Sequence, residues 1–337
     1  WTNLMLVVTG GAGFVGSNLI EALNQSGREK ILLVDDLTDA SKIANLADLT
    51  ISDYADKDEF LSDIERRGIP ESVTGVFHQG ACSDTMATDG QDVMSTNYVY
   101  SKKLFLACAR AGVSFIYASS ASVYGREGPF RESGEGERPL NAYAYSKFLF
   151  DRYVSAERAN ISNQVVGLRY FNVYGPREDH KSRMASVAWH IVAQYHKGGT
   201  VRLFDGSGGY GPGEQRRDFV HVQDVARVNL FFLDNPSISG IFNVGTGVSR
   251  SFNEVALVAI NACRDVDGDA PLSLSDAQSQ KVLSYFPMPE ALTGKYQSFT
   301  EASIDQLQSV GYSTPWTNLE NGVAHYARQR YQALKAN

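Results

Sequence analysis

Leu4-Met-Leu-Val-Val8 is followed at once by Thr9-Gly-Gly-Ala-Gly-Phe-Val-Gly16, and this pairing of an apolar run with a glycine-rich turn decides the fold. The apolar run has the length and composition of a buried strand. Gly10, Gly13 and Gly16 form a variant of the dinucleotide-binding fingerprint, in which glycines allow a tight turn, a close pyrophosphate and close packing of the next helix on the sheet. We therefore expect strand, turn and helix in this order, with the helix N-terminus facing phosphates.

A second apolar run, Ile31-Leu-Leu-Val34, ends in Asp35 and Asp36. An acidic residue about twenty residues beyond the glycines is where a dinucleotide fold normally holds a ribose hydroxyl. Asp35 suits a free 2′-hydroxyl, whereas Lys42 and Lys57 lie downstream, where a cation could neutralise a 2′-phosphate. The residues themselves therefore leave both NAD and NADP open.

Strand-like apolar runs alternate with helical patterns through about residue 175. Strands are expected at Val73–His78, Ser114–Ala118 and Gln164–Phe171, and helices at Met94–Ala111 and Ala142–Ala159. This alternation predicts an α/β protein with a doubly wound parallel sheet, the Rossmann architecture.

After Gly175-Pro176 the alternation breaks up. We expect a loop at 177–183, a helix near Met184–His196 and a glycine-rich stretch at 206–213. Residues 217–225 and 240–245 then look like chain returning to the first domain. The sequence therefore predicts a dinucleotide-binding domain of residues 1–175 plus about 218–250, and a smaller interleaved C-terminal substrate lobe of about 176–217 plus 251–337.

Composition narrows the classes of function. The 337 residues are 43% hydrophobic, enough for a full core, and the net charge of -7 is dispersed, which argues against nucleic-acid binding. No apolar stretch is long enough to span a bilayer, and three widely spaced cysteines (Cys82, Cys108, Cys263) without a secretory segment favour a reduced, cytoplasmic protein. The six histidines show no metal-ligand spacing, so no metal site is expected.

Tyr143-Ala-Tyr-Ser-Lys147 places a phenol and an ammonium four residues apart, on one face of a helix. A tyrosine used as a base near neutrality needs its pKa lowered by roughly three units, and a fixed cation supplies part of that. Ser120 lies just past the end of a strand-like run and could bond the substrate oxygen whose proton Tyr143 removes. The pattern indicates proton transfer at an alcohol or ketone.

The glycine turn, Tyr143–Lys147 and Arg169-Tyr-Phe-Asn-Val-Tyr-Gly-Pro176 together resemble the extended short-chain dehydrogenase/reductase superfamily of nucleotide-sugar enzymes, over essentially the whole chain. Three further stretches are similar to the ADP-L-glycero-D-manno-heptose 6-epimerase family: Gln79-Gly-Ala-Cys-Ser83, Gly175-Pro-Arg-Glu-Asp-His-Lys-Ser-Arg-Met-Ala-Ser186 and Gly294-Lys-Tyr-Gln-Ser-Phe-Thr300. This second similarity is more specific than the fold.

The resemblance implies an isomerase that inverts C6″ of ADP-D-glycero-D-manno-heptose without net redox change. Bound NADP would take hydride from C6″, leaving a transient ketone, and return it to the other face. Tyr143 and Lys181 would be the two acid/base residues, with Ser120 and Lys147 supporting the tyrosine. The product would be a precursor of the lipopolysaccharide core, and we expect a homo-oligomer.

The resemblance also implies which residues contact each ligand. The cofactor would contact, besides the three glycines, Phe14, Val15, Asp35, Asp36, Lys42, Lys57, Gln79, Gly80, Ala81, Cys82, Ser83, Asn97, Tyr143, Lys147, Val173 and Lys181. The substrate would contact Asn172, Arg183, His190, Phe204, Asp205, Gly206, Ser207, Arg217 and Tyr296. Either Arg217 or Arg216 would clamp the diphosphate by charge-assisted hydrogen bonds, because 208–215 is longer than the usual family segment. Arg183 stands where the family has a small polar residue.

Three rival functions are weighed on named positions. A 4,6-dehydratase would place an Asp-Glu pair after the catalytic serine, where this chain has Ala121-Ser122. A UDP-hexose 4-epimerase shares Ser120, Tyr143 and Lys147 but needs no second base at Lys181, and it is the alternative enzyme. A nucleotide-sensing module on the same fold has no need for all four of Ser120, Tyr143, Lys147 and Lys181, so their joint presence argues against it.

Overall fold

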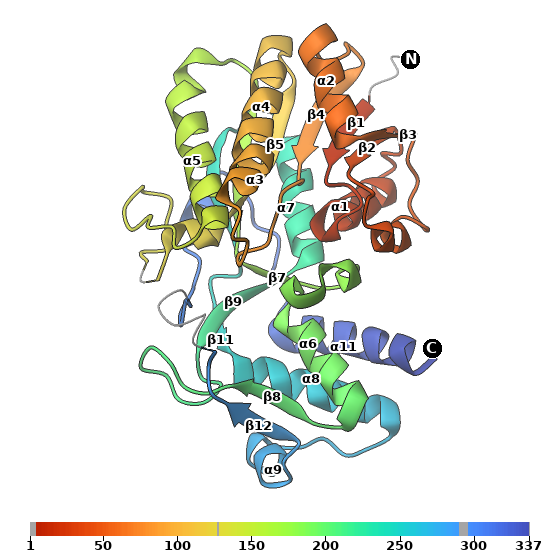
Figure 1. Cartoon of the computed structure of the whole chain (residues 1–337), viewed down its shortest axis with the longest axis vertical. Coiled ribbons are helices and arrows are strands. Elements are labelled where there is room, and N and C mark those ends of the chain that lie inside the picture. Colours follow the sequence, from red (N-terminus) through yellow and green to blue (C-terminus); the bar gives the residue numbers. More distant parts are fainter. Residues whose placement is uncertain (1–4, 127, 290–295, 337) are drawn as a thin grey trace.

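The computed structural model describes residues 5–126, 128–289 and 296–336, so Trp1–Leu4 and the Gly294-Lys295 part of one quoted motif lie outside the described residues. A seven-stranded parallel sheet forms the larger part of the molecule, in the order β10-β6-β5-β4-β1-β2-β3 (Figure 1). Its strands are β1 (Met5–Thr9), β2 (Ile31–Asp35), β3 (Asp53–Asp56), β4 (Val73–His78), β5 (Ser114–Ser120), β6 (Val165–Tyr170) and β10 (Gly240–Val244). The predicted α/β fold is confirmed.

Helices cover both faces of this sheet. On one face α1 (Phe14–Gln25) and α7 (Val222–Asp234) pack together and share a buried apolar cluster with the strands. On the other face a second cluster is built by α2 (Lys57–Arg67), α4 (Tyr100–Ala111) and α5 (Ala142–Glu157). The expected Met94–Ala111 helix begins earlier, as α3 (Gly90–Met94), and reaches α4 through a π-helical turn at Ser95–Val99. This two-sided covering makes the sheet doubly wound.

A smaller part with its own apolar cluster lies below the sheet in Figure 1. It contains a three-stranded sheet of β7 (Asn172–Tyr174), β9 (Arg216–His221) and β11 (Ser249–Ser251), and a two-stranded sheet of β8 (Val201–Phe204) and β12 (Leu283–Phe286). Its helices are α6 (Val187–Gly198), α8 (Phe252–Asp267), α9 (Leu274–Ser279) and α11 (Leu319–Ala336), while α10 (Asp305–Ser309) contacts β10. Short 3₁₀ turns are η1 (Ala40–Asn45), η3 (Ala121–Tyr124), η4 (Arg158–Asn160) and η5 (Asp179–Met184).

The chain passes between the two parts more than once. After β6 it enters the smaller part through β7, and it returns to place α7 against α1 and β10 beside β6. It then crosses again into β11 and α8. This path agrees with interleaved lobes. The exact lobe boundaries stay a prediction, and the one expected between residues 217 and 218 falls inside β9.

The helix expected from Met184 begins later than predicted. Residues 179–184 form the 3₁₀ turn η5, and α6 starts at Val187. Ser182 has φ 50° and ψ -121°, which interrupts a helical path. The Ser186 hydroxyl then accepts a hydrogen bond from the Trp189 amide at 3.2 Å, so it caps the new helix.

Close backbone approach explains two glycines of the fingerprint. A β-carbon on Gly10, whose φ is 65°, would lie 2.5 Å from the Gly80 nitrogen, and one on Gly16 would lie 2.0 Å from the Gly10 oxygen. Both positions therefore exclude a side chain. In the described residues no helix is long and apolar enough to cross a membrane.

Candidate active site

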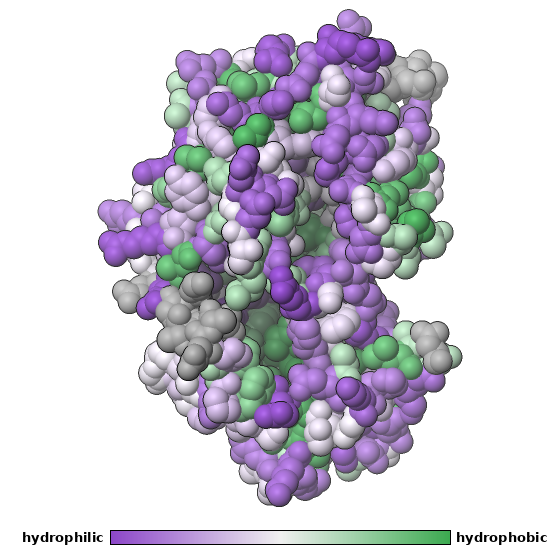
Figure 2. Space-filling view, in the orientation of Figure 1, coloured by the Kyte–Doolittle hydropathy of each residue, from purple (hydrophilic) through white to green (hydrophobic). Residues whose placement is uncertain are grey.

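A cavity of about 980 Å³ lies where the carboxyl ends of the main strands face the smaller part of the molecule. The space-filling view shows a hollow between the upper and lower halves, with apolar residues visible inside it (Figure 2). Ligands bind at this edge in doubly wound folds. Most predicted site residues line it: Gly10, Gly13, Phe14, Val15, Gly16, Asp35, Lys42, Gln79, Gly80, Ala81, Cys82, Ser83, Ser120, Tyr143, Lys147, Asn172, Val173, Lys181, Arg183, His190, Phe204, Arg217 and Tyr296.

The first half of the cavity fits a dinucleotide. The N-cap of α1 is Gly13, which has no side chain to bond the free amides of the first turn, and Gly13 to Gly16 line the cavity. An anion such as a pyrophosphate would satisfy those amides. Asp35 follows on the neighbouring strand, where it accepts hydrogen bonds from the Ala12 amide at 2.8 Å and the Lys42 ammonium at 3.0 Å.

Three predicted cofactor residues do not line the cavity. Asn97 is fully buried behind the cavity wall, where its side-chain amide bonds both the nitrogen and the oxygen of Cys82, at 2.8 and 2.9 Å. Asp36 accepts from the Thr38 amide at 2.9 Å, and Lys57 pairs with Asp58 at 2.8 Å and with Asp36 at 3.7 Å. Asn97 therefore shapes the wall, while the other two lie further out.

Tyr143 and Ser120 come together from two elements, since Ser120 ends β5 and Tyr143 lies in the first turn of α5. The helix begins there because the Asn141 side chain accepts from the Ala144 amide at 2.8 Å. Burial raises the pKa of Tyr143, and its hydrogen bond with Ser120 opposes that rise. The expected lowering by Lys147 is thus not present in this arrangement, in which the Lys147 ammonium donates to the Ala118 carbonyl at 2.8 Å.

The charge on Lys147 predicts a pH effect. Burial lowers the pKa of Lys147 from its usual 10.5 to about 8, and the Asp151 carboxylate opposes this shift. The ammonium is therefore present below pH 8 and lost above it, and turnover that needs the cation should fall as the pH rises through about 8. Measuring kcat between about pH 6 and pH 10 checks this. In Lys147→Arg, whose guanidinium stays charged, the fall in kcat should shift to higher pH. If the fall stays near pH 8 in this variant, another group causes it.

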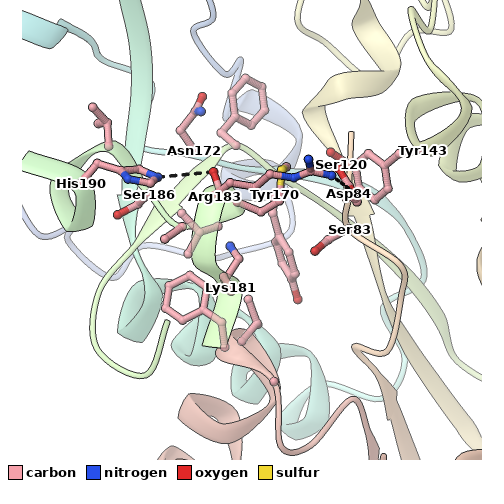
Figure 3. A pocket seen from close by; sticks show the side chains of 18 of the residues that line it. Ser83, Asp84, Ser120, Tyr143, Tyr170, Asn172, Lys181, Arg183, Ser186 and His190 are labelled. Atoms are coloured by element: carbon pink, nitrogen blue, oxygen red, sulfur yellow. Dashed lines mark hydrogen bonds and ion pairs between the residues drawn. The ribbon is translucent and has the colours of Figure 1, made fainter. Parts of the chain in front are cut away.

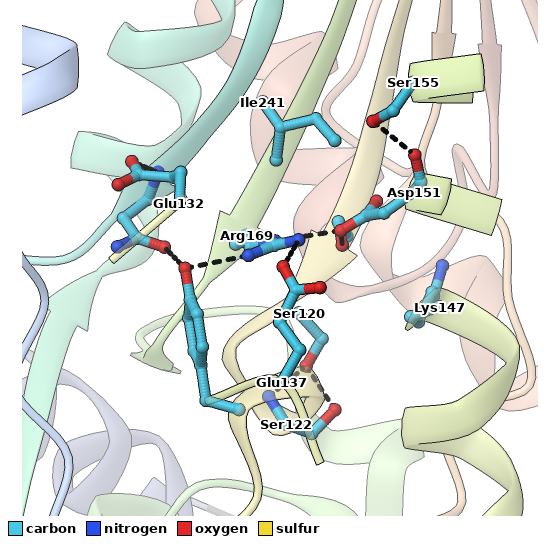
Figure 4. Close-up of polar contacts among 12 residues, drawn as sticks. Ser120, Ser122, Glu132, Glu137, Lys147, Asp151, Ser155, Arg169 and Ile241 are labelled. Atoms are coloured by element: carbon cyan, nitrogen blue, oxygen red, sulfur yellow. Dashed lines mark hydrogen bonds and ion pairs between the residues drawn. The ribbon is translucent and has the colours of Figure 1, made fainter. Parts of the chain in front are cut away.

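A buried ion-pair network anchors the back of the Ser120–Tyr143 region (Figure 4). Arg169, on β6, donates to Asp151 of α5 at 2.8 Å and to Glu137 at 2.6 Å, and both pairs are shielded from solvent. Asp151 also accepts from the hydroxyls of Tyr117, at 3.0 Å, and Ser119, at 2.8 Å. The network thereby ties α5, which carries Tyr143, to the strand that ends in Ser120.

Removing one charge from this network should destabilise the protein strongly. Asp151→Asn keeps the shape but leaves the Arg169 charge with Glu137 alone, and breaking a buried pair typically costs about 3–5 kcal/mol. The free energy of unfolding in urea measures the loss. Asp63→Asn, at an exposed ion pair on α2, is the matched control and should stay within about 0.5 kcal/mol of the parent. Equal effects in the two variants would contradict the structural role.

Lys181 lines the cavity from η5, an element of the opposite wall (Figure 3). Its ammonium lies 4.9 Å from the centre of the Phe14 ring. Burial lowers the pKa of Lys181, and the nearby Glu178 carboxylate partly offsets this. The cavity therefore holds two groups able to exchange protons, Tyr143 and Lys181, on separate elements.

An ion pair joins the two walls. The Arg183 guanidinium donates to the Asp84 carboxylate at 2.5 Å, between η5 and the loop that follows β4. Figure 3 shows this side chain extended across the cavity. His190 lies behind it, with its Nε2 atom 3.4 Å from the Arg183 carbonyl. Asp84 was missed in the sequence, although it directly follows the Gln79–Ser83 segment.

The far end of the cavity combines a buried cation with aromatic rings. The Arg217 guanidinium lies 4.8 Å from the Tyr296 ring centre and donates to the Arg216 carbonyl at 3.3 Å, and no ion pair among the described residues includes it. Arg216 points elsewhere, donating to the Ser249 carbonyl at 2.6 Å. Of the two candidates, Arg217 is therefore the one placed for an anion.

Asp205, Gly206 and Ser207 do not line this end, whereas Gln215 does. The Gln215 side chain donates to the Asp205 carbonyl at 2.7 Å and the Ser207 hydroxyl at 3.1 Å, so it holds the loop from the cavity side. Arg202 also lines the cavity and was not expected there, although it shares a strand face with Phe204 by period-two spacing. Further lining residues that were not expected include Tyr170, His180, Ser186, Gln194, Phe252 and Phe286.

Two other expectations concern cysteines and metals. The three cysteines are free thiols, two of them buried. Among residues 5–126, 128–289 and 296–336 no cluster of His, Cys, Asp and Glu could hold a metal ion.

Comparison with known proteins places the whole chain among nucleotide-sugar enzymes. A protein of Thiobacillus denitrificans named ADP-L-glycero-D-manno-heptose-6-epimerase is 54% identical over 97% of this chain and 98% of its own. The solved structure of the Helicobacter pylori protein of that name superimposes with a TM-score of 0.78 at 29% identity, covering 100% of this chain and 97% of that one. A Thermus thermophilus UDP-glucose 4-epimerase in complex with NAD gives a TM-score of 0.74 at 27% identity, over 97% and 99% of the two chains.

Residues 6–245 match one family in particular, and they include the glycine turn, Ser120, Tyr143 and Lys181. The chain belongs to the NAD dependent epimerase/dehydratase family.

Proposed function

We propose that this chain is an ADP-glyceromanno-heptose 6-epimerase, which inverts C6″ of ADP-D-glycero-D-manno-heptose to give the L-glycero epimer. The observation that carries the proposal is the presence of two acid/base groups, Tyr143 and Lys181, on different elements around one cavity. The name and the high identity of the Thiobacillus denitrificans relative support the same substrate.

In the proposed mechanism a different acid/base residue acts on each face of the reacting carbon. Bound nicotinamide would supply reversible oxidation at C6″. Tyr143, hydrogen-bonded to Ser120, takes the hydroxyl proton of one epimer, and Lys181 exchanges the proton of the other. Because burial lowers its pKa, Lys181 gives up its proton more readily than an exposed lysine does. Arg217 is assigned to the diphosphate by charge-assisted hydrogen bonds.

NADP is the proposed cofactor. Lys42 supports it, because its ammonium lies at the end of β2, 3.0 Å from Asp35 and 2.9 Å from the Asp36 carbonyl, where a 2′-phosphate would gain a charge partner. Denaturing the purified protein and identifying the released dinucleotide by mass spectrometry tests this. Recovery of NAD alone would mean that Lys42 only pairs with Asp35 and does not bind a 2′-phosphate. We also propose that the protein is cytoplasmic and forms a homo-oligomer. The three free thiols support the cytoplasmic location.

The substrate is tested by incubating the protein, without added cofactor, with ADP-D-glycero-β-D-manno-heptose and following C6″ by proton NMR. A parallel reaction contains UDP-galactose. Conversion to the L-glycero epimer is the expected result and would also establish a retained cofactor. Inversion of UDP-galactose alone would identify the protein as a UDP-hexose 4-epimerase. No conversion in either reaction, with cofactor bound, would favour a nucleotide sensor.

A further inference from the structure

Glu178 is a buried carboxylate that lies outside the cavity and has no assigned role. Its side chain is 1% exposed and accepts three hydrogen bonds. The donors are the Ser186 amide at 2.6 Å, the Ser186 hydroxyl at 2.6 Å and the Tyr326 hydroxyl at 2.9 Å. A buried carboxyl group with this many donors fixes its surroundings firmly, because losing one partner would leave a buried polar group unsatisfied.

These bonds close the segment that carries Lys181. Glu178 lies immediately before η5 and Ser186 immediately before α6, so the carboxylate joins the two ends of the 179–185 stretch. Tyr326 belongs to α11, which fixes the joined ends to the smaller part of the molecule. Within the stretch, the Lys181 amide donates to the Glu178 carbonyl at 3.0 Å. The position of the Lys181 backbone therefore depends on the Glu178 carboxylate.

The same segment is held in a strained conformation. Arg177 and Ser182 have φ values of 71° and 50°, in a region that side-chain-bearing residues rarely adopt, so both positions need tertiary contacts to hold them. Arg177 is secured by its hydrogen bonds to the Asn45 carbonyl at 2.6 Å and to Asp48 at 2.7 Å. The far end, near Ser182, has Glu178 and Ser186 as its anchor.

We infer that Glu178 is a positioning residue for Lys181: its carboxylate holds η5 so that the lysine side chain reaches the oxygen on the reacting carbon. The inference rests on the proposed function for the role of Lys181. It excludes direct contact with substrate, since Glu178 faces Ser186 and Tyr326 rather than the cavity. The carboxylate also favours the charged form of the lysine, against the effect of burial.

The test replaces Glu178 by glutamine, which keeps the size but offers one acceptor oxygen in place of two. Either epimer is added to the cofactor-loaded enzyme, and ketone formation in the first turnover is followed by the transient absorbance of reduced nicotinamide. The expected result is a loss of up to about 100-fold, the scale for a misplaced catalytic group, in oxidation of the one epimer that Lys181→Met also impairs. KM should stay within about threefold. Glu178→Asp should recover part of the rate.

The matched control is Asp179→Asn in the same turn. Asp179 is 70% exposed, and water can replace it as the partner of Trp189 and Arg330, so its removal should leave both oxidations near the parent rates. Equal slowing of both epimers in Glu178→Gln, or equal behaviour of the two variants, would overturn the inference. If Glu178→Gln does not fold, Tyr326→Phe decides, because it removes one donor of three. Selective slowing supports the inference, and parent rates with both epimers refute it.

Hydrogen exchange separates this inference from the proposed function. In Glu178→Gln the peptide spanning 178–186 should exchange faster than in the parent protein and in Asp179→Asn, whatever the substrate is. Unchanged exchange would overturn the inference. A parent protein that inverts neither epimer would defeat the proposed function alone.

Discussion

Tyr143→Phe is expected to lower kcat for epimerisation by at least about 10²-fold while leaving the fold and the bound cofactor in place, the usual scale for a positioned acid or base. The change removes one hydroxyl from the cavity wall and leaves the ring. Ser120, which loses its tyrosine partner, still accepts from the Ser122 amide at 3.2 Å and hydroxyl at 2.9 Å, and its own O–H lines the cavity, where water can accept its proton. The loss should therefore appear in turnover and not in stability.

Conversion of the D-glycero to the L-glycero epimer by proton NMR measures the effect, with thermal unfolding and cofactor content determined on the same samples. Tyr145→Phe is the matched control, because Tyr145 lies on the same helix but is 46% exposed. It should turn over at the parent rate. A Tyr143→Phe protein with near-normal kcat would remove the tyrosine from the mechanism.

Local sequence patterns predicted the scaffold well. The strand at Val73–His78 was placed at its exact bounds, and the glycine turn after β1 is where close backbone contacts exclude side chains. These features depend on neighbours in the sequence, such as a short apolar run and the residues that end it. The convergence of Ser120 and Tyr143 follows from the same patterns, because each lies at a predictable end of a strand or helix.

What the sequence could not give depends on partners far along the chain. Arg183 meets Asp84 across 99 positions, and Glu178 meets Tyr326 across 148. No local pattern marks such pairs. The same reason applies to Lys147. Its spacing from Tyr143 predicts a shared helix face, but its bond to the Ala118 carbonyl depends on how α5 packs against β5. The direction of the Tyr143 pKa follows from burial, which spacing does not reveal.

Lys181→Met should slow inversion by at least about 10²-fold and still permit the oxidation of one epimer. Methionine is similar in length, and its apolar side chain suits the buried position beside Phe14, so the fold and the cofactor should be retained. Because Tyr143 is untouched, one epimer should still be oxidised to the ketone, seen as reduced nicotinamide. The other epimer should be inert. Tyr143→Phe should give the opposite selectivity.

Lys197→Met, at the exposed end of α6, is the control for removing an ammonium and should behave like the parent protein. Oxidation of both epimers by Lys181→Met would mean that Tyr143 serves both faces of the carbon, and Lys181 would then be a cavity cation without a proton to transfer. Loss of both oxidations would instead make Lys181 a substrate-binding residue. Only loss of one fits two bases on opposite walls, since each wall then handles its own epimer.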